Sequence, residues 1–118
     1  MKAGLFLGAL VSMSAIAANV PAPLVANNIE VSPTTQIERL IVYSKLGNGD
    51  VFVSTDAHSE QCSNGYFIDK ASAGYEGIVS MLIAAYQAKT PIQLSGYTDA
   101  FWGGSTGPVC ALYNVTYP

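Results

Sequence analysis

The chain has 118 residues and a formal net charge of −3 at pH 7, from five basic and eight acidic side chains. This length suits a single domain, and the low number of lysine and arginine residues disfavours binding to nucleic acid or to an anionic membrane surface through clustered positive charge. Half of the residues are hydrophobic and only 11% are charged. We therefore expect any binding site to rely on aromatic and small polar side chains.

The first 18 residues have the pattern of a secretory signal peptide. Lys2 provides the charged start, an apolar run covers Ala3–Val11, and Ala15-Ile16-Ala17 forms an Ala-x-Ala cleavage motif. The apolar run is too short to span a membrane as a stable helix, so no membrane insertion is expected. The pattern predicts a secreted or periplasmic protein that is cleaved between Ala17 and Ala26.

Residues 19–36 contain three prolines and show no clean periodicity. We expect an N-terminal arm here, with a short edge strand at Asn28–Val31. The single domain is then expected to cover residues 37–118.

Residues 37–118 show the pattern of five strands. The turn residues 47–50 (GNGD) separate the first two strands, as in a hairpin, and a polar loop at 56–64 separates the second from the third. A glycine-rich loop at 97–107 precedes the last strand. The predicted strands are Ile37–Ser44, Val51–Thr55, Gly65–Asp69, Pro91–Gly96 and Pro108–Tyr117.

Ser72–Lys89 is the segment with sustained helical periodicity. One apolar face is expected to pack on the strands and consists of Tyr75, Ile78, Val79, Leu82, Ala85 and Tyr86. A neighbouring strip of small residues would allow another backbone to approach closely, and comprises Ala73, Gly77, Met81, Ala84 and Ala88. The strip is expected either to form an oligomer interface or to be the surface of an alanine-rich helix in a monomer.

The order of these elements predicts the fold class. Three strands, one helix and two further strands indicate a mostly β (α+β) protein, an OB-fold-like small barrel of five strands with the helix between strands 3 and 4. Other α+β sandwiches share this order and remain the alternative.

Cys62 and Cys110 are the only cysteines. In an exported chain an isolated pair most simply forms a disulfide, which would stabilise the fold by about 4 kcal/mol. A redox pair would instead need a C-x-x-C spacing, and a metal site would need more ligands.

His58, the only histidine, alternates with Asp56, Glu60 and Cys62 at every second position. In an extended segment these side chains would face one way and could hold a metal or supply a general base. A zinc site usually needs three or four ligands, and the disulfide would remove Cys62, so a polar loop without a metal or cofactor is expected. The sequence also lacks a nucleophile elbow and a phosphate-binding glycine pattern, which predicts a protein that is not an enzyme.

Aromatic residues beside small polar residues indicate where a ligand would bind. Aromatic rings stack on the C–H faces of sugars, while hydroxyls and carboxylates bond the sugar hydroxyls. The candidate glycan-binding residues are Tyr66, Tyr97, Asp99, Trp102 and Ser105. The alternative for Trp102 is that it closes one end of the barrel beneath the loop, and Tyr66 likewise has a place in the core as its alternative.

The chain resembles a known family in the order of its features. A signal peptide, a short β start, a cysteine before an aromatic strand, the helix Tyr75–Ala88, the strand PIQLS and a cysteine in the closing strand follow one another. In this it is similar to the B subunits of pertussis-like and subtilase-type AB toxins, and to related small exported bacterial proteins, over about Ile37–Tyr117. The resemblance implies an OB-fold that assembles into a ring, commonly a pentamer, with helices at its centre, glycans bound along its sides and a catalytic A subunit as a further partner.

These observations favour a secreted, non-enzymatic binding subunit of the toxin-B type, which oligomerises and recognises host or surface glycans. The alternative is an exported periplasmic inhibitor or stress protein that binds another protein and has no sugar ligand. A small hydrolase that uses His58 is the third hypothesis.

Overall fold

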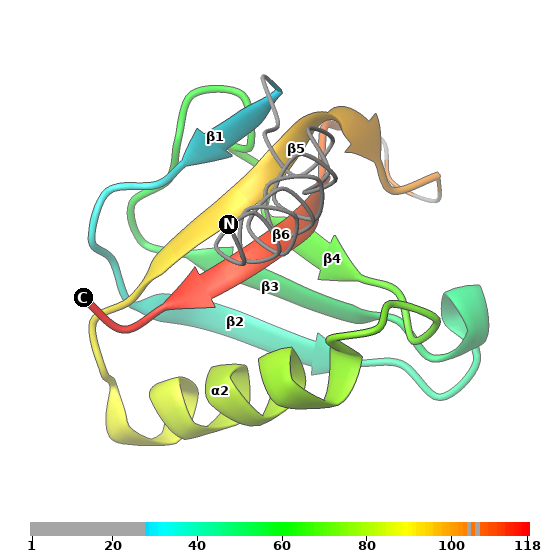
Figure 1. Ribbon diagram of the computed structural model, residues 1–118, viewed down its shortest axis with the longest axis horizontal. Coiled ribbons are helices and arrows are strands. Elements are labelled where there is room, and N and C mark those ends of the chain that lie inside the picture. The colour runs from blue at the N-terminus through cyan, green and yellow to red at the C-terminus, as the bar shows by residue number, and fades with distance from the viewer. Residues whose placement is uncertain (1–27, 104, 106) are drawn as a thin grey trace, which may run out of the picture.

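A computed structural model describes residues 28–103, 105 and 107–118. This part of the chain is mostly β and contains a six-stranded sheet and the helix α2 (Tyr75–Ala88) (Figure 1). The expected signal peptide and residues 19–27 of the expected arm lie outside the described residues. The strands are β1 (Ile29–Val31), β2 (Ile37–Val42), β3 (Val51–Thr55), β4 (Tyr66–Ile68), β5 (Gln93–Phe101) and β6 (Cys110–Thr116), and a 3-10 turn, η2, covers Leu46–Asn48.

The strand order is β1-β5-β6-β4-β3-β2, so β1 and β2 form the two edges and the sheet does not close into a five-stranded barrel. All neighbouring strands are antiparallel except β4 and β6, which are parallel. The parallel pair arises because the chain crosses over through α2 and β5 before it returns as β6 beside β4. The expected mostly β, α+β class is confirmed, whereas the expected number of strands and their closure differ.

The sixth strand comes from the segment before residue 37. β1 pairs with β5 in the register Ile29↔Tyr97 to Val31↔Ser95. Beyond β1, Thr35 and Ile92 exchange backbone hydrogen bonds of 2.8 Å in both directions. Without a neighbouring strand, the backbone N–H and C=O groups along this edge of β5 would lack hydrogen-bond partners. β1 provides those partners, and Thr35 continues the pairing at Ile92. The edge strand expected at Asn28–Val31 is therefore present as β1.

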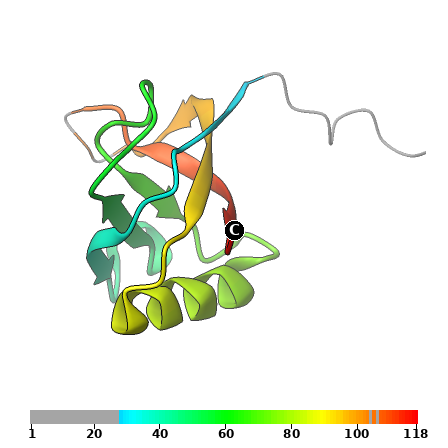
Figure 2. The ribbon, with the colours of Figure 1, turned by 90° about the vertical axis from the view of Figure 1, so that its left-hand side faces the viewer.

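The core lies between the sheet and α2, which covers one side of it (Figure 2). Leu82 and Ala85 of the helix are buried, and Val51 and Val53 of β3 have almost no exposed surface. Along β3 the burial alternates, so that Phe52 points out of the opposite face and is only half-buried. This alternation gives the sheet an apolar inner face and a separate outer face.

The predicted core face of the helix packs as expected in Leu82 and Ala85, and Tyr75, Ile78 and Val79 pack partly against it. Tyr86 is 43% exposed and lies at the margin of this face. In the strip of small residues, Met81 is half-buried and the others are exposed, and a Cβ added at Gly77 would meet nothing within 4 Å. The strip therefore faces away from the sheet of its own chain.

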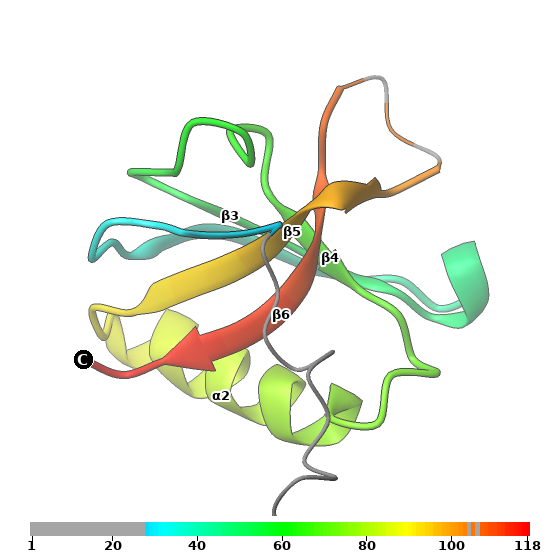
Figure 3. The same ribbon diagram turned by 45° about the horizontal axis from the view of Figure 1, so that its top comes forward.

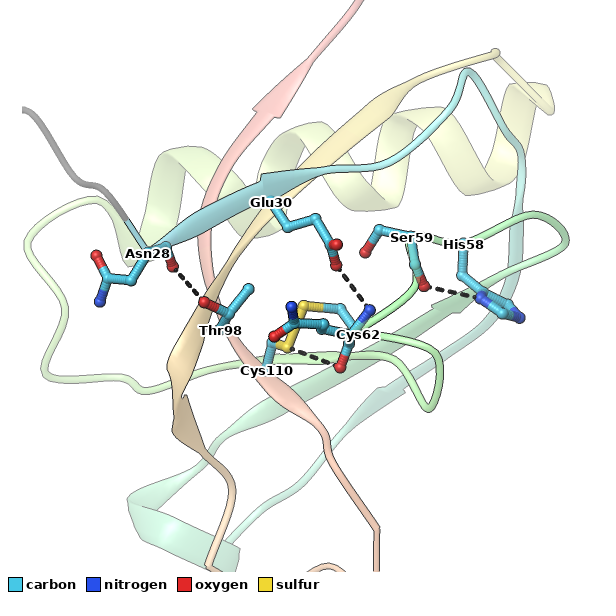
Figure 4. The surroundings of a disulfide bond; sticks show 8 residues. Asn28, Glu30, His58, Ser59, Cys62, Thr98 and Cys110 are labelled. Carbon is cyan, nitrogen blue, oxygen red and sulfur yellow. Dashed lines mark hydrogen bonds between the residues drawn. A yellow bond between two sulfur atoms is a disulfide. The ribbon is translucent and has the colours of Figure 1, made fainter.

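Cys62 and Cys110 form a disulfide, as expected, with their Cα atoms 5.5 Å apart. Both residues are completely buried, and the bond joins the 56–64 loop to the start of β6 (Figure 4). Glu30 of β1 reaches this loop and accepts a hydrogen bond of 2.8 Å from the backbone N–H of Gln61. The disulfide and this hydrogen bond both attach the loop to the sheet. Within the described ranges, no helix is long and apolar enough to cross a membrane.

Candidate functional site

The outer face of β3 and β4 carries an aromatic cluster centred on Trp102. Phe52 and Phe67 are direct cross-strand partners, and the indole lies nearly parallel to both, with ring centroids 5.9 and 5.8 Å away and interplanar angles of 17° and 13°. Tyr43 approaches the indole at 5.8 Å with a tilt of 54°. Trp102 is half-buried and lies on the face opposite to Val51, so it does not plug the interior of the fold.

A buried carboxylate fixes the orientation of this indole. The Nε1 of Trp102 donates a hydrogen bond of 2.8 Å to Oδ2 of Asp50, which is only 4% exposed. Asp50 follows the η2 turn, and its backbone N–H donates to the carbonyl of Leu46 at 2.9 Å. Gly47 has φ +60°, and a Cβ there would overlap the Asp50 carboxylate, so only glycine suits this position. The turn therefore positions Trp102.

The loop that carries Trp102 is held by its own backbone and by Ser105. The N–H of Trp102 donates to the carbonyl of Val109 at 2.9 Å. The Ser105 hydroxyl lies 2.9 Å from the carbonyl oxygen of Trp102 and 2.7 Å from that of Gly107, either of which can accept its proton. Ser105 thus stabilises the loop beside the ring.

The indole forms one wall of an open hollow of about 450 Å³, here called the indole hollow. Arg39 and Ile41 of β2 line its other side. A second, larger hollow of about 780 Å³ is called the polar hollow, and its lining includes Glu38, Ser54, Asp56, His58 and Ser63.

The two hollows share Arg39, Phe52 and Asn64 and therefore lie side by side. Together they form a groove over the outer face of β2 and β3, from the 102–109 loop to the 56–64 loop. Figure 3 shows that both loops lie at the end of the molecule away from α2.

The polar hollow contains hydrogen-bonding groups of every type. Glu38 and Asp56 supply carboxylates, Arg39 supplies a guanidinium, and Asn64 supplies an amide. All four residues are exposed, so their polar atoms can reach a ligand. The arrangement can bind a polyhydroxylated molecule by hydrogen bonds, with the aromatic cluster at one end for its apolar face.

His58 belongs to the polar hollow and not to a metal cluster. The segment after β3 bends instead of continuing as a strand, and Cys62 is in the disulfide, so the alternating residues do not face one way. The Nδ1 of His58 lies 3.0 Å from the carbonyl oxygen of Ser59, as seen in Figure 4. Over residues 28–103, 105 and 107–118, no three potential metal ligands of the His, Cys, Asp or Glu type gather.

The structure removes Tyr66 from the candidate glycan-binding residues. Its side chain has no exposed surface, and its ring packs so closely on β5 that a Cβ at Gly96 would lie 2.8 Å from it. Burial raises the pKa of the Tyr66 hydroxyl above its ordinary value. The hydroxyl lies near Ser59 and Ser32 but has no hydrogen-bond partner among the described residues. Tyr66 is a core residue and cannot contact a ligand.

Tyr97 and Asp99 are also separated from Trp102. The expected 97–107 loop begins later than predicted, because β5 continues to Phe101. Tyr97 packs edge-on against Tyr113 of β6, with ring centroids 5.4 Å apart, and Asp99 is exposed on the strand. Neither residue lines the indole hollow or the polar hollow. Of the five candidates, only Trp102 and Ser105 are brought together.

Several groove residues were not predicted from the sequence. Phe52 had a local signal, because it alternates with Val51 and Val53 and had to face outward. Arg39, Asp50 and Asn64 come from a strand, a turn and a loop, and only the fold brings them together.

No family model, curated protein or solved structure matches the chain.

Proposed function

We propose that the chain is an exported, non-enzymatic binding subunit that recognises glycans in the groove over β2 and β3. The observation that carries this proposal is the fixed indole of Trp102, which stacks on Phe52 and Phe67 and is bonded to Asp50 at the wall of an open hollow. An aromatic ring held in one orientation offers a flat apolar surface at little entropic cost, and the C–H face of a sugar fits such a surface.

The topology supports an OB-fold-like relation. Apart from β1, the strands follow the order β2-β3-β4-β6-β5 with the parallel pair β4 and β6, and α2 follows the third of them. An OB-fold has this order. OB-folds bind oligosaccharides and oligonucleotides on the face of their second and third strands, between the loop after the first strand and the loop before the last.

The aromatic cluster occupies the equivalent place in this chain. Phe52 and Phe67 lie on β3 and β4, Asp50 lies in the loop after β2, and Trp102 lies in the loop before β6. A formal charge of −3 disfavours an oligonucleotide, so of these two ligand classes the charge favours a carbohydrate.

The position of the groove is compatible with self-association through α2. The strip of small residues is exposed except for the half-buried Met81, and the two loops that bound the groove lie at the end away from α2 (Figures 1 and 3). Copies packed through their helices would therefore keep their grooves free. We propose a ring of this kind, as the family resemblance implies, with several glycan sites on its outside.

The proposed export of the protein is supported by the disulfide and by the signal-peptide pattern. A disulfide persists in an oxidising compartment, such as the periplasm or the outside of a cell. We therefore propose that the protein acts after export.

A glycan array with the mature, disulfide-bonded protein tests the function. The unchanged protein should bind a defined set of glycans, and Trp102→Ala should lose this binding by a factor of ten or more, as expected for one stacked aromatic residue worth about 1.5 kcal/mol. Phe101→Ala is the matched control, because Phe101 is the preceding residue, is 49% exposed and lines neither hollow. An array without signal, or equal binding by Trp102→Ala, would contradict glycan recognition in the groove and would favour the protein-binding alternative.

A further inference from the structure

We infer that the groove binds a neutral oligosaccharide of at least two rings, with one ring on the Trp102 indole and the next in the polar hollow. This inference rests on the proposed function and names its ligand class. The inference is based on the volumes of the two hollows, on the residues that they share, and on the charges in the polar hollow.

The size of the polar hollow is the first observation. Its volume of about 780 Å³ exceeds the 450 Å³ of the indole hollow, and both lie within the roughly 300–1,000 Å³ that is typical of small-molecule sites. A single sugar ring on Trp102 would leave the larger hollow empty. A ligand that fills both hollows must therefore extend beyond one ring.

The continuity of the hollows is the second observation. Arg39, Phe52 and Asn64 line both of them, so the two hollows adjoin at these three residues. The Asn64 side chain lies against Gly107 of the opposite loop, where a Cβ would overlap its amide. Arg39 and Asn64 thus lie where the glycosidic linkage of a bound disaccharide would run, with the Phe52 ring between the two sites.

The charge of the polar hollow is the third observation. Its lining includes two carboxylates, those of Glu38 and Asp56, and a single guanidinium, that of Arg39, and the chain as a whole is negative. Carboxylates accept hydrogen bonds from sugar hydroxyls but repel the carboxylate of an acidic sugar. The second ring is therefore a neutral sugar with free hydroxyl groups.

Calorimetric titration with matched sugars tests this ligand class. The probes are galactose and lactose, glucose and cellobiose, and N-acetylglucosamine and chitobiose, with 3′-sialyllactose as the acidic form of lactose. In the pair that binds best, the disaccharide should bind about tenfold more tightly than its monosaccharide, from a few added hydrogen bonds. Sialylation should bring no gain in affinity.

Variants assign this gain to the polar hollow. Glu38→Gln and Asp56→Asn should each weaken the disaccharide several-fold and leave the monosaccharide unchanged, because only the second ring lies beside them. Glu60→Gln is the control, since Glu60 is exposed in the same loop but lines neither hollow. Trp102→Ala should weaken both sugars.

The outcomes separate the inference from the proposed function. Equal affinity for mono- and disaccharides, with binding that still depends on Trp102, would overturn the two-ring inference and leave glycan recognition standing. A preference for 3′-sialyllactose would overturn the neutral ligand class. The absence of binding to every sugar, including those of the array, would overturn both proposals.

Discussion

The indole N–H of Trp102 is bonded to the carboxylate of Asp50, although 52 positions separate the two residues in the chain. Asp50 ends the turn between β2 and β3, and Trp102 begins the loop between β5 and β6. This hydrogen bond joins two loops that lie far apart in the sequence. It is the contact that holds the aromatic wall of the groove in place.

Asp50→Ala should release the indole, whereas Asp50→Asn should keep it in place, because the amide oxygen of asparagine can still accept from Nε1. Trp102 is the only tryptophan, so its fluorescence reports on this site alone. We expect a red-shifted emission and a loss of about 1–2 kcal/mol in the free energy of unfolding for Asp50→Ala, and the native emission for Asp50→Asn. Asp99→Ala, at an exposed position on β5, is the control. Unchanged emission in Asp50→Ala would show that the indole needs no carboxylate.

Trp102→Ala should destabilise the fold less than a change in the core. The indole covers only the outer face of the sheet, so its removal should cost about 1–2 kcal/mol. Leu82→Ala removes a completely buried side chain between α2 and the sheet and should cost about 2–5 kcal/mol. Urea denaturation followed by circular dichroism measures both values. If Trp102→Ala is the more damaging change, the indole belongs to the folding core and not to a ligand platform.

Ala84→Trp should break the proposed self-association and leave the monomer folded. Ala84 is exposed, so a larger side chain meets no atom of its own core, but it would fill the space into which a second helix packs. Light scattering of the mature protein on a sizing column measures the mass. Gln87→Trp places the same ring on the polar side of the helix and should keep the native oligomer. An oligomer that survives Ala84→Trp would place the interface elsewhere.

Tyr66→Phe should change stability at neutral pH by less than about 1 kcal/mol, because the buried hydroxyl has no hydrogen-bond partner among the described residues. Desolvation raises the pKa of this phenol in the folded state above its ordinary value of 10.0. The unfolded chain then releases the proton first, so the contribution of Tyr66 to stability is complete below pH 10 and falls as the pH rises further. The difference between the denaturation curves of the two proteins from pH 8 to 11 should show this decline. A constant difference would mean that Tyr66 titrates normally when folded.

Replacing both Cys62 and Cys110 by serine should lower the free energy of unfolding by about 4 kcal/mol. The bond closes a long loop, with a sequence separation of 48 residues, and removes much of the freedom of the unfolded chain. Thermal denaturation of the variant and of the reduced protein should give similar midpoints. Midpoints equal to that of the oxidised protein would show that the fold does not depend on the bond.

The sequence was a good guide wherever the pattern is local. The helix face with Leu82 and Ala85, the strand with Val51 and Val53, and the hairpin turn between β2 and β3 all follow from periodicity and turn residues. The disulfide followed from the cysteine count. The extension of β5 to Phe101 was missed, because the partners that order it, Asn28 and Cys110, are distant in the chain.

The site was predicted less well than the fold, because its residues also come from segments that are distant in the chain. Tyr66 was named as a ligand candidate with a place in the core as its alternative, and the alternative holds, because its strand is central in the sheet and its ring is buried. Trp102 and Ser105, both named as candidates, lie together at the wall of the indole hollow, and their role in binding stays a prediction. The Trp102 partners Phe52 and Asp50 could not be named, because their proximity depends on how the loops meet above the sheet.

The disulfide also has a consequence for the order of events in the life of the protein. Cys62 directly precedes two residues that line the groove, Ser63 and Asn64, and Cys110 directly follows Val109 of the opposite loop. The bond therefore joins the two loops that border the groove covalently to each other. A newly made chain in a reducing compartment lacks this bond, so we expect it to reach the oxidising side in a form that does not yet recognise its ligand. On the proposed export of the chain, formation of the disulfide would then enable the proposed recognition.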